Sequence, residues 1–236
     1  MTENAKPIAI VTGGGTGLGQ AAARQLLADG FQVYAFGMDV EEEIAHPCHS
    51  FTRFDVTEEA AIAALAADFE GVDALINAAG IILHEGKEFG NDGFRKVMEV
   101  NLRGTQLMCF AFERALKARR GAVVNFASMW SIFGSGRNPA YSASKGAVES
   151  LTRALAVAWG GDGVRVNAVA PGWIRTRMSV NAMTTPERAG PILNRIPANR
   201  WGEPAEVAAA VGFLVSPAAS YINGAVLPVD GGYSIA

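Results

Sequence analysis

The chain has 236 residues, of which half are hydrophobic, and its formal net charge is −3. This size suits one domain with a full core, and the lack of a basic stripe argues against nucleic acid as a partner. No apolar run approaches the roughly 20 residues that cross a bilayer, and the first residues lead into a strand pattern without a signal peptide, so no membrane association is expected.

The first 36 residues predict a strand, a glycine-rich turn, a helix and a second strand. Residues 7–12 form a continuous apolar run, which is typical of a strand buried on both faces of a parallel sheet. A helix is predicted over 20–28 and a strand over 31–36. Between the first strand and the helix lies the turn Gly13-Gly14-Gly15-Thr16-Gly17-Leu18-Gly19. This arrangement is a βαβ unit, in which the glycines let a pyrophosphate approach the amides at the start of the helix.

The same alternation continues to the end of the chain. Strands are predicted at 49–54, 72–76, 122–127, 164–169 and 225–228, and helices at 58–69, 93–118, 141–159 and 204–215. Asn91 or Asp92 is expected to cap the helix over 93–118, and only 173–200 is predicted to be irregular. Strict alternation predicts an α/β fold: a single domain over 1–236 with a doubly wound, seven-stranded parallel sheet. Ligands of such folds bind beyond the carboxyl ends of the strands.

One segment carries residues suited to catalysis. Ser128 precedes Tyr141 by thirteen residues, and Lys145 follows Tyr141 by four. On a helix, Tyr141 and Lys145 share one face. A free tyrosine ionises near pH ~10, and a neighbouring cation lowers that pKa, so this pair predicts a tyrosine that acts as a general acid and base. Asn101 lies in the middle of a predicted helix, where its propensity is unfavourable.

These motifs, in this order, resemble the compact form of the short-chain dehydrogenase/reductase family, and the resemblance covers essentially the whole chain. The resemblance rests on the turn from Thr12 to Gly19, on Asn77-Ala78-Ala79-Gly80, on Asn101, on Ser128, Tyr141 and Lys145, and on Pro171-Gly172 with Ile174 and Thr176. It implies a Rossmann fold with helices on both faces of the sheet. It also implies an NAD(P)-dependent oxidoreductase that interconverts a secondary alcohol and a ketone by hydride transfer.

The resemblance assigns a role to each matching residue. Tyr141 would exchange a proton with the substrate oxygen, Lys145 would lower the pKa of Tyr141 and bind the nicotinamide ribose, and Ser128 would hydrogen-bond the reacting oxygen. Asn101 would hold a water molecule in a proton relay. The implied cofactor contacts are Gly13, Thr16, Gly17, Leu18, Gly19, Asp55, Val56, Asn77, Ala78, Ala79, Gly80, Tyr141, Lys145, Pro171, Gly172, Ile174 and Thr176.

The end of the second strand bears on the choice of cofactor. Members of the family that use NAD usually carry an Asp there, whereas this chain has Gly37, with Asp39 two residues further on. Asp39 could reach the ribose if the loop bends back. Members that use NADP tend to carry a basic residue at positions that are here Thr16 and Met38, and Arg53 is the nearest other cation. We therefore expect NAD rather than NADP.

The substrate is less constrained by the sequence. Residues 173–200 occupy the family's variable lid, and arginines near the pocket could bind a carboxylate. We expect a sugar, a sugar acid or a polyol, with a 3-oxoacyl thioester or another apolar ketone as the alternative. The candidate substrate contacts are Ser128, Trp130, Arg137, Tyr141, Trp173 and Met178.

Two other functional classes remain open from the fold. A non-catalytic dinucleotide-binding sensor could share it, but such a sensor needs none of the four residues Asn101, Ser128, Tyr141 and Lys145. A sugar-nucleotide epimerase or dehydratase would need a larger C-terminal substrate region.

The resemblance also implies a homotetramer, formed through the helices over 93–118 and 141–159 and through the last strand. Cys48 and Cys109 lack metal-ligand spacing, so no metal is expected. Free thiols of this kind indicate a reducing compartment, and we expect a cytoplasmic protein.

Overall fold

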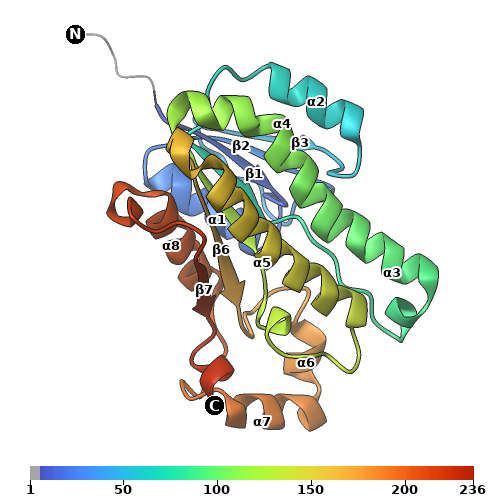
Figure 1. Ribbon diagram of the computed structural model, residues 1–236. Coiled ribbons are helices and arrows are strands. Elements are labelled where there is room, and N and C mark those ends of the chain that lie inside the picture. Colours follow the sequence, from blue (N-terminus) through green and yellow to red (C-terminus); the bar gives the residue numbers. More distant parts are fainter. Residues whose placement is uncertain (1–5) are drawn as a thin grey trace.

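The computed structural model describes residues 6–236, and these form one seven-stranded sheet in which every strand pair is parallel. The strand order is β3-β2-β1-β4-β5-β6-β7 (Figure 1). The strands are β1 (Ile8–Thr12), β2 (Gln32–Gly37), β3 (His49–Arg53), β4 (Ala74–Asn77), β5 (Ala122–Phe126), β6 (Arg165–Pro171) and β7 (Val226–Val229). The order reverses direction at β1, which confirms the predicted doubly wound sheet.

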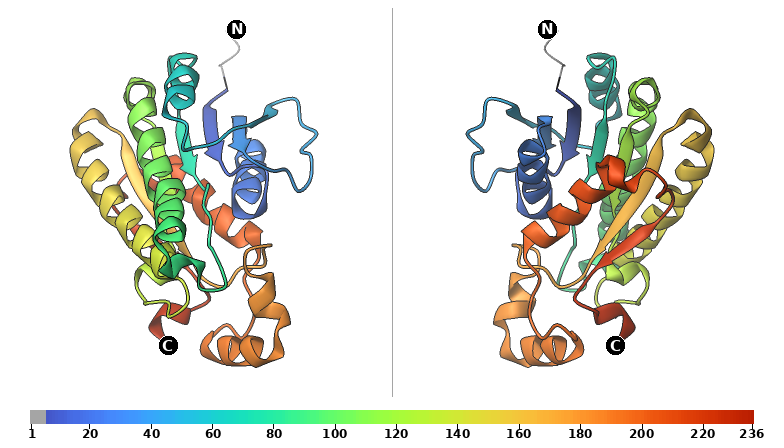
Figure 2. Two further views of the ribbon diagram at one scale, coloured as in Figure 1. Left: turned by 90° about the vertical axis from the view of Figure 1, so that its right-hand side faces the viewer. Right: turned by 90° about the vertical axis from the view of Figure 1, so that its left-hand side faces the viewer.

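Helices cover both faces of the sheet. The α-helices of the described chain are α1 (Gly17–Ala28), α2 (Glu59–Ala67), α3 (Asn91–Met98), α4 (Gly104–Arg119), α5 (Pro139–Trp159), α6 (Val180–Thr184), α7 (Pro186–Arg195) and α8 (Pro204–Val215). α1 and α8 pack together on one face, and α2, α4 and α5 lie on the other (Figures 1 and 2). Along β1, Ala9 and Val11 join the core cluster beneath α1 and α8, whereas Ile10 joins the cluster beneath α4 and α5. This alternation is the two-residue period expected of a strand buried on both faces.

The predicted helix over 93–118 is interrupted. α3 ends at Met98, a π-helical turn spans Glu99–Arg103, and α4 follows. Asn101 lies within this turn, and its side chain binds the backbone of Ile81, which lies outside the helix. The extra residue of a π turn changes the direction in which a side chain points. We infer that the helix is irregular here because Asn101 has to reach the backbone of Ile81. The predicted cap is also wrong, because α3 begins at Asn91 itself and Gly90 occupies the cap position.

The segment 173–200, predicted to be irregular, contains α6 and α7. In Figure 1 the arrowheads of β6 and β7 point toward these two helices, and both views of Figure 2 show them beyond the carboxyl edge of the sheet. Ile192 and Leu193 of α7 pack in a separate cluster with Trp201 and Tyr233. Both helices are short and α7 contains Pro191, so their apolar periodicity is too brief to be recognised in the sequence.

Within residues 6–236, every helix is too short or too polar to span a membrane. The same residues contain no group of three or more His, Cys, Asp or Glu side chains that could hold a metal ion. Cys48 and Cys109 are both buried and unpaired with each other.

Candidate active site

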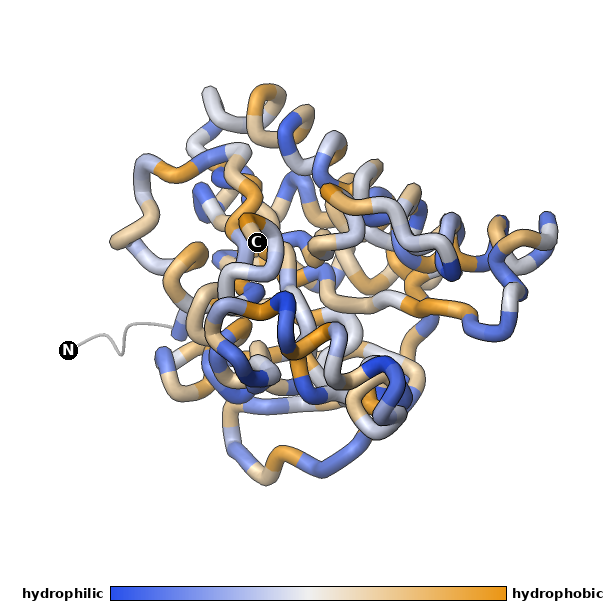
Figure 3. Tube along the Cα trace, turned by 90° about the horizontal axis from the view of Figure 1, so that it is seen from below, coloured by the Kyte–Doolittle hydropathy of each residue, from blue (hydrophilic) through white to orange (hydrophobic). Residues whose placement is uncertain are grey.

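A cavity of about 1090 Å³ lies at the carboxyl edge of the sheet. Figure 3 views the molecule from this side, where hydrophilic and hydrophobic residues are interspersed along the surrounding segments. Most of the residues that the sequence singled out line this cavity. They are Gly13, Thr16, Gly17, Leu18, Gly19, Asp39, Asp55, Val56, Ala78, Ala79, Gly80, Ser128, Trp130, Arg137, Tyr141, Lys145, Pro171, Gly172, Trp173, Ile174, Thr176 and Met178. Asn77 and Asn101 are the two predicted site residues that do not line it.

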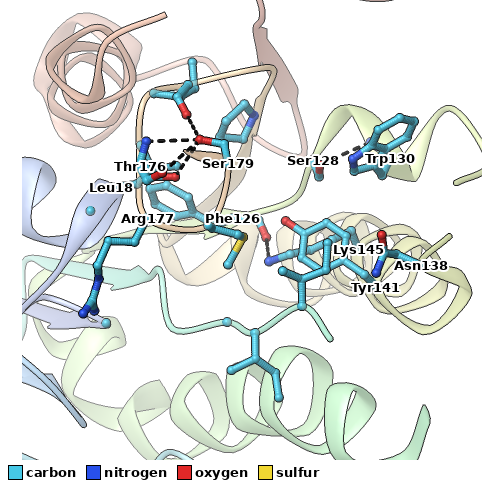
Figure 4. Close-up of a pocket in the computed structure, with 18 of the residues that line it drawn as sticks. Leu18, Phe126, Ser128, Trp130, Asn138, Tyr141, Lys145, Thr176, Arg177 and Ser179 are labelled. Carbon is cyan, nitrogen blue, oxygen red and sulfur yellow. Dashed lines mark hydrogen bonds between the residues drawn. The ribbon is translucent and has the colours of Figure 1, made fainter. Parts of the chain in front are cut away.

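Ser128, Tyr141 and Lys145 meet at one wall of the cavity (Figure 4). Ser128 follows β5 and its Oγ accepts a hydrogen bond from the N–H of Trp130 at 3.2 Å. Tyr141 and Lys145 lie one turn apart on α5, and the Lys145 ammonium is 5.5 Å from the centre of the Tyr141 ring. Lys145 is only 4% exposed, and its Nζ donates to the carbonyl of Phe126 at 2.7 Å.

The pKa values of the pair differ from the sequence-based prediction. Burial raises the pKa of Tyr141 to about 12, although a hydrogen bond with Ser128 acts in the opposite direction. Burial lowers the pKa of Lys145 to about 8. The predicted lowering of the tyrosine pKa by Lys145 is not seen in this structure, where burial is the largest cause of the shift, and it stays a prediction. Loss of water around the phenolate is the largest cause of the raised pKa, and the Lys145 ammonium donates its hydrogen bond to the carbonyl of Phe126.

Asn101 and Lys145 both lie beside Gly80. A methyl group added at Gly80 would lie 3.4 Å from Asn101 Oδ1 and 3.5 Å from Lys145 Nζ. Asn101 Oδ1 accepts from the Ile81 N–H at 2.7 Å, and its Nδ2 donates to the Ile81 carbonyl at 2.9 Å and to Ser144 Oγ at 3.1 Å. Both hydrogens of the amide are thus used within the protein, and Asn101 joins the loop after β4 to α5.

The side chain of Asn77 faces the core, contrary to its prediction as a cofactor contact. Its Nδ2 donates to Asn125 Oδ1 at 2.9 Å and to Cys109 Sγ at 3.3 Å. Asn77 and Asn125 are paired neighbours on β4 and β5, so the pleat directs both side chains to the same face of the sheet. The motif's next three residues, Ala78, Ala79 and Gly80, do line the cavity.

The glycine-rich turn fits the pyrophosphate of a dinucleotide. Gly13 has a φ of +67°, and a Cβ there would lie 2.8 Å from the Ala79 nitrogen, so the turn packs directly on the loop after β4. The N–H of Gly17, the first residue of α1, donates to a carboxylate oxygen of Glu41 at 2.9 Å. The start of α1 therefore already binds an anionic group, as expected for the amides and dipole of a helix N-terminus.

Glu88 was missed in the sequence, although it supports the catalytic helix. It is fully buried, at 0% exposure, in a short 3-10 helix before α3. One of its carboxylate oxygens accepts from the Leu83 N–H at 2.9 Å and from Asn138 Nδ2 at 3.2 Å, and the other accepts from the Tyr141 N–H at 2.9 Å. No sequence pattern distinguishes this Glu from a solvated one, because its burial depends on contacts fifty residues away.

The cavity lining also contains residues that were not among the predicted site residues, and three of them carry polar or charged groups from the outer segments. Tyr233 reaches it from the C-terminal segment, and its hydroxyl accepts from Arg195 at 3.3 Å. Lys96 and Arg188 bring positive charge to the lining from α3 and α7.

Comparison with known proteins agrees with this geometry. The family model described as "Enoyl-(Acyl carrier protein) reductase" matches residues 13–234. The chain is 42% identical to a galactitol 2-dehydrogenase (L-tagatose-forming) of Cereibacter sphaeroides, over 96% of this chain and 94% of that protein. It is 37% identical to a 2-dehydro-3-deoxy-D-gluconate 5-dehydrogenase of Pseudoalteromonas atlantica, over 96% and 95%.

A solved structure is similar throughout. The gluconate 5-dehydrogenase of Burkholderia cenocepacia, in complex with NADP and tartrate, superposes with a TM-score of 0.90. Its sequence is 31% identical, and the match covers 98% of this chain and 96% of that one. The chain therefore belongs to the short-chain dehydrogenase/reductase family, the NAD(P)-dependent oxidoreductases that interconvert secondary alcohols and ketones.

Proposed function

We propose that the protein oxidises a secondary alcohol of a sugar, sugar acid or polyol, or reduces the corresponding ketone, with Tyr141 as general acid and base. The observation that carries this proposal is the meeting of Ser128, Tyr141 and Lys145 in the cavity that the glycine-rich turn also lines. The relatives named above act on galactitol and on 2-dehydro-3-deoxy-D-gluconate, which are a polyol and a sugar acid.

In the proposed mechanism, Tyr141 is protonated at neutral pH because burial raises the pKa of its hydroxyl to about 12. It can therefore donate a proton to a ketone oxygen in reduction, whereas in oxidation Tyr141 must first lose its own proton, so that the phenolate accepts the proton of the alcohol. Ser128 donates a hydrogen bond to the same oxygen and stabilises its developing charge. The nicotinamide, when bound, supplies or accepts the hydride. Lys145, whose ammonium lies 5.5 Å from the centre of the Tyr141 ring, would exchange the proton with Tyr141, and Asn101 would hold a water molecule that connects Lys145 to solvent.

We propose NAD as the preferred cofactor. Asp39 and Glu41 line the cavity in the loop after β2, where the adenosine ribose of a dinucleotide would lie. Arg177 also lines the cavity, and it forms ion pairs with Glu41 at 2.6 Å and with Asp39 at 3.8 Å. Two carboxylates repel a 2′-phosphate, so we expect NADP to be the poorer cofactor. The structure of the Burkholderia cenocepacia gluconate 5-dehydrogenase contains NADP, so NADP is the alternative cofactor for this chain.

The test is reduction of NAD and of NADP in parallel, against a panel of polyols, sugars and sugar acids, with Tyr141→Phe beside the wild type. We expect turnover that is faster with NAD and that falls by about 100-fold to 10,000-fold in Tyr141→Phe, the range for loss of a general acid or base. Glu41→Gln should shift the preference toward NADP. Tight dinucleotide binding with no turnover, in either direction, would instead favour a non-catalytic sensor.

We also propose a cytoplasmic homotetramer that forms through α4 and α5. Phe110 on α4 is 51% exposed and Val157 on α5 is 86% exposed, which is costly for apolar side chains that no partner covers. Sedimentation velocity of the wild type and of Val157→Asp tests this. A tetramer that dissociates in the variant supports the proposal, and a wild-type monomer refutes it.

A further inference from the structure

The charged side chains that line the cavity are separated by sign. The three acidic ones, Asp39, Glu41 and Asp55, all follow β2 or β3. Every other charged side chain in the lining, among residues 6–236, is a cation. These cations are Lys96, Arg137, Lys145, Arg177 and Arg188. No carboxylate of the described chain therefore lines the part of the cavity around the catalytic residues.

Most arginines of the segment 173–200 have partners within the protein. Arg175 forms an ion pair with Glu203 at 2.8 Å, and Arg177 forms one with Glu41 at 2.6 Å. Arg195 lies over two aromatic rings, at 4.6 and 4.2 Å from their centres. These three guanidinium groups are thus held by the fold and are not available to a ligand.

Arg137 and Arg188 differ from these. Both line the cavity, and neither guanidinium makes an ion pair or a hydrogen bond with any residue of 6–236. The charge of Arg137 contributes, after burial, to lowering the pKa of Arg188, so the two groups act on each other electrostatically. The buried carboxylate of Glu88 does not line the cavity and already accepts three hydrogen bonds. Like charges that share a cavity are unfavourable unless an anion lies between them.

The two arginines approach the reacting centre from different elements. Arg137 lies four residues before Tyr141, just ahead of α5, and Arg188 lies on α7 in the segment beyond the carboxyl edge. The planar, always charged guanidinium matches the two oxygens of a carboxylate or phosphate. An anion held by both would join α7 to the wall that carries Tyr141.

We propose that Arg137 and Arg188 form a binding site for an anionic group of the substrate, so that the preferred substrate is a hydroxy acid of the sugar-acid class rather than a neutral polyol. This inference rests on the proposed function. It would separate this chain from the galactitol 2-dehydrogenase, because galactitol carries no charge.

The test compares three compounds with one six-carbon skeleton: sorbitol, gluconate and sorbitol 6-phosphate. We expect kcat/KM to be at least tenfold higher for an anionic compound than for sorbitol. Arg188→Ala and Arg137→Ala should each reduce that preference by about 10-fold to 100-fold, mainly through KM, which is the range for one lost charged hydrogen bond. Arg175→Ala is the matched control, because Arg175 lies in the same segment outside the cavity lining.

The outcomes separate the two proposals. Equal kcat/KM for sorbitol and the anions, or an equal loss of preference in Arg175→Ala, would refute the anion site and leave the proposed function intact. A preference for the phosphate over gluconate would support the site and assign it to a phosphate group. If none of the three compounds reacts, calorimetric titration of gluconate in the presence of NADH still decides. Binding that weakens tenfold or more in Arg188→Ala supports the site, and unchanged or absent binding refutes it.

Discussion

Replacing Glu88 should lower the free energy of unfolding substantially, although most substitutions of Glu in a polar segment have little effect on stability. Glu88→Ala removes the acceptor of three hydrogen bonds, those from the Leu83 and Tyr141 N–H groups and from Asn138 Nδ2. A buried donor without an acceptor costs about 1–3 kcal/mol, so three of them cost about 3 kcal/mol or more. Glu88→Gln keeps one oxygen but turns an amide N–H toward at least one donor, and we expect a loss of about 1–3 kcal/mol.

Urea unfolding followed by circular dichroism measures these differences in the free energy of unfolding. Glu85→Gln is the matched control, because Glu85 is an exposed neighbour whose ion pair with Lys87 lies at the surface. We expect that control to change stability by less than about 0.5 kcal/mol. The expected order of stability is wild type, then Glu88→Gln, then Glu88→Ala. A Glu88→Ala variant as stable as the control would refute the hydrogen-bond assignment.

Glu88 should also affect the chemistry of Tyr141, because its negative charge helps to raise the pKa of that hydroxyl. Removing the charge in Glu88→Gln lowers the tyrosine pKa. Tyr141 must be protonated to act as an acid, so ketone reduction should then fail at a lower pH than in the wild type. An unchanged alkaline limb of the pH–rate profile would contradict this expectation.

Three further predictions concern the fold. Gly13→Ala forces a Cβ to within 2.8 Å of the Ala79 nitrogen at a φ of +67°, and it should weaken dinucleotide binding, as measured by fluorescence titration, and lower the melting temperature. Phe112→Ala empties a fully buried site and should cost about 3–5 kcal/mol in urea unfolding. Lys145 has a folded pKa of about 8, below its ordinary value of 10.5, so the unfolded chain binds more protons between these pH values. Wild-type stability relative to Lys145→Met should therefore rise with pH above 8, by at most about 1.4 kcal/mol per pH unit, and a flat difference up to pH 10 would contradict it.

The sequence predicted the parts of the molecule that depend on local patterns. The strands β1, β4 and β5 are short runs that are buried along nearly their whole length, whereas β3 at the edge is polar and partly exposed. A short, continuous apolar run is typical of a parallel strand that is buried on both faces, so these segments were predicted as strands. Tyr141 and Lys145 were recognised for a similar reason, because four-residue spacing on a helix fixes which side chains are neighbours.

What the sequence could not predict depends on contacts between distant segments. The π turn at Asn101 exists because its side chain binds Ile81, twenty residues away. The pKa of Tyr141 depends on how completely α5 is covered, which spacing within one helix does not reveal. The burial of Glu88 likewise requires Asn138 and Tyr141 to lie beside it.

The carboxylate of Glu41 links three parts of the site in one contact. Glu41 lies in the loop after β2. Its carboxylate accepts a hydrogen bond from the N–H of Gly17 at the start of α1, and it forms an ion pair with Arg177 of the segment 173–200. In the proposed function, the cofactor's pyrophosphate takes the place of this carboxylate on the helix amide. The affinity measured for a dinucleotide then reflects the difference in free energy between binding the pyrophosphate and binding the Glu41 carboxylate at this amide. Arg177 pairs with the other oxygen of the same carboxylate, so cofactor affinity and the position of the segment 173–200 both depend on the side chain of Glu41.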